Sequence, residues 1–387
     1  MNRRLHVHHL ITKLELGGAQ QNTLYCVRNH SRDRFKVSLG TGPGGILDGD
    51  ARGIKDASVH FMPGLVREIN PKRDFSFLRR FSRFLKDEKV DILHTHSSKA
   101  GILGRFAAAM AKVPIIIHTV HGWGFHERQR YPVRKLYITL ERMAAYQSDL
   151  LVAVSRENRE QGLREGIGSY SQYAIIRSGI DISAFRKASR TAKAVRSELG
   201  IPANGLVVGT VGNFKPQKAP LDFVAAAFLV LKSIPNAYFV MVGDGELRGE
   251  TKLAANRLGI QNRLVFTGWR RDIPDLLHSF NVFALTSIFE GLPRSVLQAQ
   301  AAGVPVVATA AGGTPEAVSE GITGYITRVG DVEAVASRLI HLLGNPRVAR
   351  DMGKAGAEMI GEEFEIRKML RDIEREYCRL AETKRLA

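Results

Sequence analysis

Short apolar runs of strand length alternate with longer segments of helical period along the whole chain. Runs that are apolar on both faces lie at residues 115–117, 150–154, 206–211, 238–242 and 304–308. Strands of this kind, separated by helices, are typical of parallel sheets that helices cover on both faces. The pattern predicts an α/β protein with doubly wound parallel sheets, whose ligands bind in the loops at the carboxyl ends of the strands.

A polar stretch without strand character, residues 183–204, interrupts this pattern. With 387 residues the chain is also longer than one hydrophobic core usually organises. We therefore expect two domains, residues 1–182 and 205–368, on either side of a linker. A last helix at residues 369–387 could return to the first domain.

The composition excludes several classes of protein. Hydrophobic residues make up 44% and charged residues 24% of the chain, which is ordinary for a globular protein. No apolar stretch approaches the roughly 20 residues of a membrane-spanning helix, and the histidines in the first apolar run favour a strand over a signal peptide. Cys26 and Cys378 have no Cys or His at metal-ligand spacing nearby, so no disulfide framework or zinc site is predicted.

The formal net charge of +18 is concentrated in the first half of the chain. Residues 1–180 contain 29 basic and 16 acidic residues, and residues 181–387 contain 27 and 22. Such a field attracts nucleic acid, anionic lipid or phosphorylated substrates, and charge alone does not choose among them.

The segment Thr286–Gly313 has the pattern strand, loop, helix. The strand ends at Ser287, the loop carries Glu290, Gly291 and Leu292, and the helix begins near Pro293. Backbone N–H groups at a helix start favour a diphosphate, and a neighbouring carboxylate can accept hydrogen bonds from sugar hydroxyls. The alternative is an ordinary strand-loop-helix unit with an exposed glutamate.

This segment resembles the signature of the family 4 retaining glycosyltransferases, which have the GT-B fold of two facing Rossmann-like domains. The signature has two glutamates eight positions apart. Glu290 matches the first, which contacts the donor sugar, but the position of the second, the usual ribose ligand, holds Gln298. An amide lacks the charge assistance of a carboxylate, so we expect weaker nucleotide affinity.

Further segments of the second half resemble donor-binding loops of the family. In Val211–Lys218, Lys218 matches the lysine that grips the donor pyrophosphate, while the arginine position holds Asn213 and Lys215 could supply the missing charge. Two solvated loop lysines are the alternative. The resemblance also implies that Gly268 and Trp269 line the base pocket. Glu316 matches the glutamate that closes the sugar end of the site.

In the first half, Gly17 and Gly18 resemble the family's N-terminal glycine loop, and His121 matches its active-site histidine, which contacts the donor sugar. The pairs His94/His96 and His118/His121 also invite a metal site, but no carboxylate or cysteine nearby completes a tetrahedral set. We expect no metal and no cofactor. Asp48-Gly49-Asp50 has the spacing of a metal–nucleotide motif, but a plain turn is expected there.

The resemblance implies a retaining, metal-independent glycosyltransferase with Glu290, His121 and Lys218 as its catalytic residues. The expected donor is a nucleotide diphosphate sugar, UDP-linked, and the expected acceptor is a lipid-linked glycan or oligosaccharide of cell-surface polysaccharide biosynthesis. The narrower resemblance is to the subgroup that builds capsule, O-antigen and exopolysaccharide.

Rival functions and the cellular location complete these expectations. A nucleotide-sugar epimerase of the same fold and a nucleic-acid-binding protein are the rivals. No stacking-aromatic motif or recognition helix supports a specific nucleic-acid partner. We expect a cytoplasmic enzyme, peripheral at an anionic inner membrane face. The segment 72–89 could form an amphipathic helix on that surface or a crossover helix that packs on the sheet.

Overall fold

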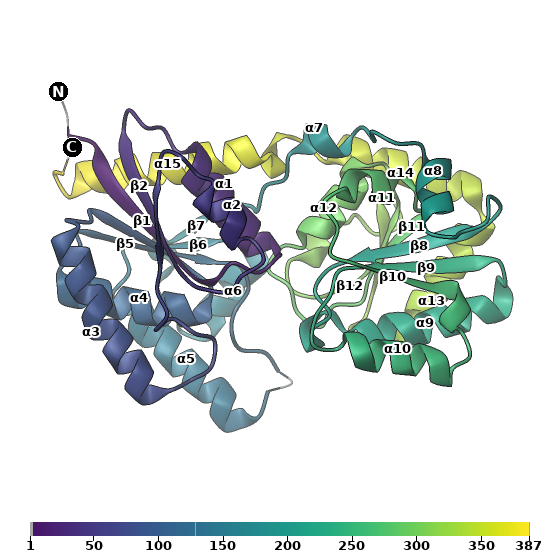
Figure 1. Ribbon diagram of the computed structural model, residues 1–387, viewed down its shortest axis with the longest axis horizontal. Helices are drawn as coiled ribbons and strands as arrows, with labels where there is room; N and C mark the ends of the chain where they lie inside the picture. Colours follow the sequence, from purple (N-terminus) through teal and green to yellow (C-terminus); the bar gives the residue numbers. More distant parts are fainter. Residues whose placement is uncertain (1–2, 128, 387) are drawn as a thin grey trace. The chain divides into compact units, whose positions relative to one another are not determined.

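The computed structural model describes residues 3–127 and 129–386, which form two compact units (Figure 1). The first unit contains the chain up to Ser178 together with the C-terminal segment from Arg367, and the second unit is Gly179–Ile366. Each unit is a parallel sheet between helices, so the predicted fold class, two Rossmann-like α/β domains, is confirmed.

The first unit is built on a seven-stranded parallel sheet of order β3-β2-β1-β4-β5-β6-β7. In chain order its strands are β1 (Leu5–Lys13), β2 (Phe35–Gly42), β3 (Ser58–Phe61), β4 (Ile92–His96), β5 (Ile115–Val120), β6 (Leu150–Ala153) and β7 (Tyr173–Ile175). Its helices are α1 (Gly18–Asn29), α2 (Asp48–Arg52), α3 (Pro71–Asp87), α4 (Ser98–Ala111), α5 (Tyr131–Tyr146), α6 (Arg156–Arg164) and α15 (Ile366–Thr383). Asp48 and Asp50, expected in a plain turn, lie in the short helix α2.

The second unit has a six-stranded parallel sheet of order β10-β9-β8-β11-β12-β13. Its strands are β8 (Leu206–Val211), β9 (Ala237–Val242), β10 (Leu264–Gly268), β11 (Val282–Leu285), β12 (Val306–Thr309) and β13 (Gly324–Thr327). Its helices are α7 (Ile182–Phe185), α8 (Ala192–Glu198), α9 (Pro220–Ser233), α10 (Arg248–Arg257), α11 (Ile273–His278), α12 (Arg294–Ala301), α13 (Val332–Gly344) and α14 (Pro346–Met359).

The polar stretch 183–204 differs from the expected linker, because it folds as part of the second unit and contains α7 and α8. Its polar side chains attach it to that unit. Ser189 donates to Asp275 from its backbone N–H at 2.6 Å and from its hydroxyl at 2.8 Å. Arg196 donates to the carbonyl of Ser279 at 2.8 Å and to the amide oxygen of Asn281 at 2.9 Å. Because this segment is held by polar side chains, its sequence is as polar as that of a linker.

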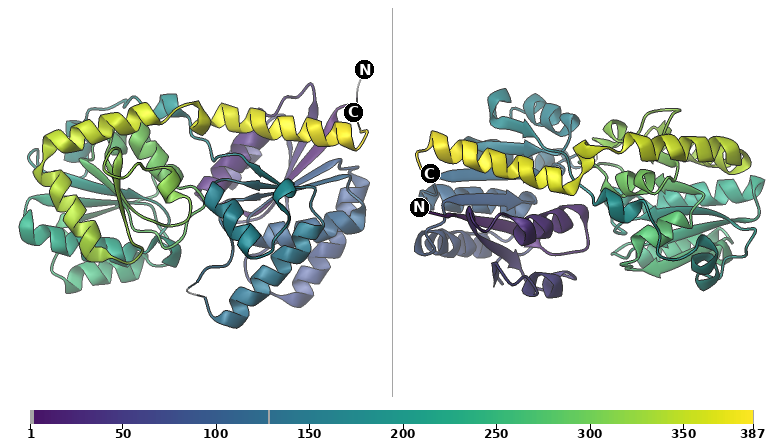
Figure 2. Two further views of the ribbon diagram at one scale, coloured as in Figure 1. Left: turned by 180° about the vertical axis from the view of Figure 1, so that it is seen from behind. Right: turned by 90° about the horizontal axis from the view of Figure 1, so that it is seen from above.

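The chain crosses back to the first unit through α15, which lies along that unit (Figure 2). Glu374 of α15 accepts hydrogen bonds from His30 and Ser31, and Tyr377 bonds His94 at 2.6 Å. Lys384, just beyond the helix, pairs with Asp149 at 2.7 Å. The C-terminal segment is therefore fixed to the first unit by polar contacts, of which those between Glu374 and His30 and between Tyr377 and His94 are buried.

The segment 72–89 corresponds to α3, and its apolar side is part of the core of the first unit. Phe77, Phe81 and Leu85 are buried in a cluster with residues of the sheet and of α4. The crossover interpretation of this helix is therefore correct. In the part of the chain that the structure describes, no helix has the length and apolar character needed to cross a bilayer.

Candidate active site

An ion pair in the loops of the second unit joins two of the predicted catalytic residues. Lys218 Nζ lies 2.5 Å from Glu290 Oε1, and the hydroxyl of Ser287 donates to the same oxygen at 2.6 Å. Glu290 is buried, whereas the Lys218 side chain keeps 22% of its surface exposed. Both donors engage Oε1, so Oε2 is the oxygen that can accept from a ligand.

Main-chain and side-chain bonds hold the loops of Lys218 and Glu290 together. Thr286 Oγ1 lies 3.1 Å from the carbonyl oxygens of both Lys218 and Ala219. Ala219 has a left-handed backbone with φ of 43°, an unusual conformation for a residue with a Cβ. The backbone N–H of Ile288 donates to the carbonyl of Gln217 at 2.7 Å. A strained backbone such as that of Ala219 persists only where neighbouring bonds enforce it, and such strain is common at functional sites.

The pair Gly312 and Gly313 lies close to the backbone of Glu290 and Gly291. Gly313 N–H donates to the carbonyl of Gly291 at 3.1 Å. Gly312 has φ of +52°, and a Cβ at this position would lie 1.9 Å from the carbonyl oxygen of Glu290. Only glycine therefore fits here. Glu316 follows in a short 3-10 turn, on the same loop as the glycine pair.

The loops after β8, β9 and β10 also meet. Gly243 N–H donates to the carbonyl of Gly268 at 2.9 Å, and Gly212 N–H donates to the carbonyl of Val242 at 3.0 Å. The ring of Trp269 reaches within 3.5 Å of the position that a Cβ of Gly243 would take. This brings the predicted base-pocket residues close to the loop that carries Asn213 and Lys215.

Asn213 has a polar atom that suits a ligand contact. Its side-chain oxygen is buried and makes no hydrogen bond with the described residues. A buried polar atom without a partner is costly, so the site gains if a ligand donates to it. Lys215 begins the short turn Pro216–Lys218, which carries Lys218 towards Glu290.

Helix α12 begins at Arg294 with Pro293 before it, as the sequence predicts. Gly291 and Leu292 are buried just ahead of the helix start. Gln298 is half-buried on the second turn of α12. No acidic residue lies in the first turn, so the positive end of the helix dipole is not neutralised there and can favour an anion.

In the first unit, the predicted residues lie at the carboxyl ends of β1 and β5. Gly17 precedes α1 with an extended backbone, and Gly18 is the first residue of that helix. His121 directly follows β5, and its Nε2 lies 3.1 Å from Nδ1 of His96. The structure thus places the predicted residues in two groups, one in each unit, and each at the expected edge of its sheet.

Sequence reasoning missed the residues that support these groups. The sequence pattern identifies Ser287 only as the end of a strand. Its hydroxyl nevertheless donates to the carboxylate of Glu290, three positions later. His9 was read only as an interruption of an apolar run, but it is buried and lies 3.0 Å from His96. A polar residue at a fully buried strand position was the signal that could have identified His9.

Two family models match the chain, one over each unit. The model described as Glycosyltransferase Family 4 matches residues 16–184, and the model described as Glycosyl transferases group 1 matches residues 192–359. The N-terminal match includes His121, and the C-terminal match includes Lys218 and Glu290.

Curated relatives match most of the chain. The UDP-Gal:alpha-D-GlcNAc-diphosphoundecaprenol alpha-1,3-galactosyltransferase of Escherichia coli is 35% identical over 80% of both chains. The N-acetyl-alpha-D-glucosaminyl L-malate synthase of Bacillus anthracis is 28% identical over 79% of both. Among solved structures, Anabaena HepE in complex with UDP and glucose has a TM-score of 0.84 at 21% identity, covering 97% of this chain and 100% of that one. The last likeness establishes the fold alone.

Proposed function

The chain belongs to glycosyltransferase family 4, and from that membership we propose that it moves a sugar from a UDP-linked donor to a lipid-linked acceptor. The observation that carries the proposal is the 35% identity, over 80% of both chains, to an enzyme whose name gives UDP-Gal as donor and a diphosphoundecaprenol-linked GlcNAc as acceptor. The complex of HepE with UDP and glucose supports the same class of donor. The product would belong to a cell-surface polysaccharide.

The donor diphosphate would lie at the start of α12, beside Lys218. The backbone N–H groups after Gly291 and Leu292 and the positive helix end attract its oxygens. Lys215 and the amide N–H of Asn213 would donate to it from the loop after β8, while the Asn213 oxygen would accept from a hydroxyl of the donor. The two lysines and the helix end supply positive charge where the leaving diphosphate develops negative charge, so we propose that transfer is metal-independent.

The sugar and nucleoside would be held by the remaining groups. Oε2 of Glu290 would accept from sugar hydroxyls, and Glu316 would close that end of the site. From the family resemblance, we also propose that His121 contacts the donor sugar. Gln298 would bind the ribose, while Gly268 and Trp269 would line the base pocket. Gly17 and Gly18 would allow close approach of the backbone to the donor.

We propose front-side attack with retention of configuration. The bond from the anomeric carbon to the diphosphate oxygen breaks while the acceptor oxygen attacks from the same side. The departing phosphate oxygen takes the proton of the acceptor hydroxyl, so no covalent sugar–enzyme intermediate is formed. The enzyme then contributes positioning and electrostatics, and Lys218 stabilises the leaving group.

A pocket of the first unit supports a lipid-linked acceptor at a membrane face. It has a volume of about 450 Å³ and lies between α3 and the segment after β3. Its lining combines three phenylalanines with two arginines: Phe77, Phe81, Phe84, Arg73 and Arg80. Phe77 and Phe81 belong to the core, so the guanidinium groups are the part of this lining that suits an acceptor that carries phosphate. We propose a peripheral attachment to the cytoplasmic membrane face on the same side of this unit.

The test is transfer from each of several nucleotide sugars, UDP-galactose first, to GlcNAc-diphosphoundecaprenol in detergent, with the product's anomeric configuration read by NMR. We expect an α-linked product only when both substrates are present. An epimer formed from the donor alone would favour the epimerase alternative. A product of inverted configuration would contradict the retaining mechanism.

A further inference from the structure

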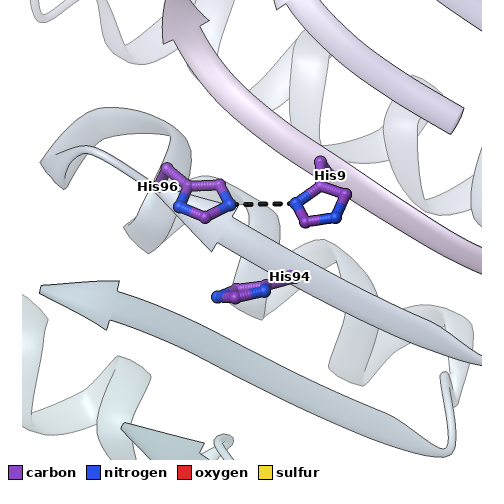
Figure 3. Close-up of side chains that lie close together, drawn as sticks. All are labelled: His9, His94 and His96. Carbon is purple, nitrogen blue, oxygen red and sulfur yellow. Dashed lines mark hydrogen bonds between the residues drawn. The ribbon is translucent and has the colours of Figure 1, made fainter. Parts of the chain in front are cut away.

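Four histidines of the first unit form a continuous hydrogen-bonded chain that ends at a carboxylate of α15. His121 Nε2 lies 3.1 Å from His96 Nδ1, and His96 Nε2 lies 3.0 Å from His9 Nδ1 (Figure 3 shows this second link). His9 Nε2 lies 3.0 Å from His30 Nε2, and His30 Nδ1 lies 3.0 Å from Glu374 Oε1. The chain therefore connects the C-terminal helix with a predicted sugar-binding residue.

Glu374 can act only as an acceptor. Its Oε1 also accepts the backbone N–H of Ser31 at 2.9 Å, and its Oε2 accepts from Arg34 at 2.6 Å. Burial alone would raise the pKa of Glu374, but the hydrogen bonds from His30 and Ser31 and the charge of Arg34 outweigh burial and lower that pKa. An ionised carboxylate has no proton to donate, so the proton between the two groups belongs to His30 Nδ1.

The position of this proton determines the tautomers of the other histidines in the hydrogen-bonded chain, because a neutral imidazole has one N–H and one lone pair. Burial lowers the pKa of His9 and His96 well below the usual range and lowers that of His30, so these rings are neutral near pH 7. His30 Nε2 then accepts from His9 Nε2–H, and His9 Nδ1 accepts from His96 Nε2–H. His96 Nδ1 in turn accepts from His121 Nε2–H.

We propose that Glu374, acting through His30, His9 and His96, fixes the tautomer of His121 so that its Nδ1 is unprotonated and can accept a hydrogen bond from a hydroxyl of the donor sugar. The tautomer follows from the chain itself, whereas the contact with the sugar rests on the proposed function. The residues behind His121 are positioning residues, since they act on the ligand only through its ring.

A metal site is the main competing use of these histidines. One ring nitrogen from each of His9, His94 and His96 lies within 4.8 Å of the others. Both nitrogens of His94 are already engaged, however: Nδ1 lies 2.6 Å from the hydroxyl of Tyr377, and Nε2 lies 2.7 Å from that of Thr119. Figure 3 shows the His94 ring beside the bonded His9–His96 pair without a bond to either. A metal bound by all three would have to break at least two of these hydrogen bonds, the one between His9 and His96 and one of those of His94.

The first test is the imidazole nitrogen spectrum of the metal-free wild-type protein labelled with 15N-histidine, with His121 assigned from a His121→Gln variant. We expect a protonated Nε2 and an unprotonated Nδ1 for His121 at pH 7.5. A predominant Nδ1–H form would overturn the proposal. This measurement needs no substrate and no substitution within the chain.

Substitutions of two buried histidines distinguish the effect of the hydrogen-bonded chain from the effect of ring packing. His9→Phe keeps a ring in the stack but cuts the chain, so His121 should become a mixture of both tautomers. His94→Phe is the matched control, because the His94 ring packs at a tilt against His9 and His96 but lies outside the hydrogen-bonded chain, so the His121 tautomer should not change. Equal changes in both variants would overturn the proposal. Should His9→Phe fail to fold, Glu374→Gln weakens the hydrogen-bonded chain at its carboxylate end.

Kinetics and zinc titration complete the test. In His9→Phe we expect kcat/KM for the donor to fall about fivefold, mainly through KM, because one hydrogen bond to the sugar is lost in part of the molecules. If the wild-type tautomer is as predicted but His121→Ala has unaltered kinetics, the hydrogen-bonded chain is confirmed. The role of His121 in the proposed function is then refuted. Stoichiometric zinc binding that shifts the His9, His94 and His96 signals would instead identify a metal site and overturn the chain.

Discussion

The carboxylate of Glu290 uses its two oxygens differently. Lys218 and Ser287 both donate to Oε1, which fixes the orientation of the group and leaves Oε2 for a ligand. The ion pair is only partly exposed, so it also holds the lysine in place before a diphosphate arrives. Each member of this group can be tested alone.

We expect Glu290→Ala to lower kcat/KM by about 100-fold or more while the protein remains folded. Glu290 is buried and accepts from Lys218 and Ser287, so its loss should lower the free energy of unfolding by about 1–3 kcal/mol. Ser287→Ala is the matched control, because it removes one bond to Oε1 and keeps the carboxylate, and its activity loss should be much smaller. Steady-state kinetics and denaturant unfolding measure both effects. Full turnover by folded Glu290→Ala would refute the role.

Gln298→Glu should tighten UDP binding several-fold, because a carboxylate makes a charge-assisted bond to a ribose hydroxyl worth about 1 kcal/mol more than that of an amide. Gln300→Glu on the same helix is the control. Gln300 is fully buried and donates to Thr323 at 3.0 Å, so this substitution should destabilise the protein without a gain in affinity. Calorimetry with UDP decides: equal or weaker binding by Gln298→Glu would mean that this position is not at the ribose.

At the scale of elements, the site of the second unit depends on the contact between the loop after β12 and the loop before α12. Gly312→Ala should displace Glu290, because the new Cβ would meet its carbonyl oxygen and φ is positive. We expect an activity loss of at least about tenfold and a destabilisation well above 1 kcal/mol.

The control for this substitution is Gly321→Ala, where φ is +73° and no atom lies within 4 Å of the added Cβ. It isolates the cost of the backbone conformation, about 1 kcal/mol, and should leave activity unchanged. Similar losses in the two variants would show that conformation, and not the contact with Glu290, is responsible.

Elements with strong periodicity could be predicted from the sequence alone. The apolar run 206–211 is strand β8, and the helix expected near Pro293 is α12, because burial on both faces and a proline at a helix start act locally. The pairing of Lys218 with Glu290 was not stated in advance, although both loops were placed at the same edge of one sheet. Topology brings loops together, but the exact contact depends on side-chain conformations.

Other features depend on contacts between distant segments and left little local signal. Glu374 and His30 form a hydrogen bond although they lie 344 positions apart in the sequence. No motif near either residue predicts this contact. The segment 183–204 is polar and lacks strand character, which predicts a linker, whereas its Ser189 and Arg190 bind the buried Asp275. Burial would raise the pKa of Asp275, but these bonds outweigh it and lower the pKa to about 2.

At the scale of the whole molecule, buried histidines are distributed unequally between the two units. Burial lowers the pKa of five first-unit histidines well below 6.5, namely His8, His9, His94, His96 and His118. The second unit holds only His278 and His341, and neither is buried. The two units should therefore respond differently to acid.

We expect the first unit to lose stability as the pH falls below about 6.5, before the second unit does. The five rings are neutral when folded but take up protons when unfolded, so the stabilisation is full above pH 6.5 and each group loses up to about 1.4 kcal/mol per pH unit below it. Asp275 has a lowered pKa, and its contribution is lost only below about pH 4.

Hydrogen exchange read by mass spectrometry, corrected for the intrinsic effect of pH, follows both units in one sample. Between pH 7.5 and 5.5, opening free energies should fall in peptides of β1, β4 and β5 and stay nearly constant in peptides of β8, β11 and β12. The second unit is thus an internal control. An equal fall in both would refute the assignment of neutral buried histidines.

Attachment to a membrane would depend on charge, because the apolar side of α3 is occupied by the core. Arg79, Arg80 and Arg83 are exposed on this helix, in the half of the chain that carries most of the basic excess. Each cation near an anionic leaflet contributes about 1 kcal/mol and is screened by salt. We therefore expect wild-type protein to sediment with anionic vesicles at low salt and to be released at high salt.

The replacement of these three arginines by glutamine should weaken vesicle binding by about 100-fold, since about 3 kcal/mol of attraction is removed. The matched control replaces Arg347, Arg350 and Lys354, three exposed basic residues of α14 in the second unit, with the same loss of charge. If binding depends only on net charge, the two triple variants will weaken alike and α3 is not the site of attachment. If the wild type stays in the supernatant on strongly anionic vesicles at low salt, the peripheral membrane proposal is wrong.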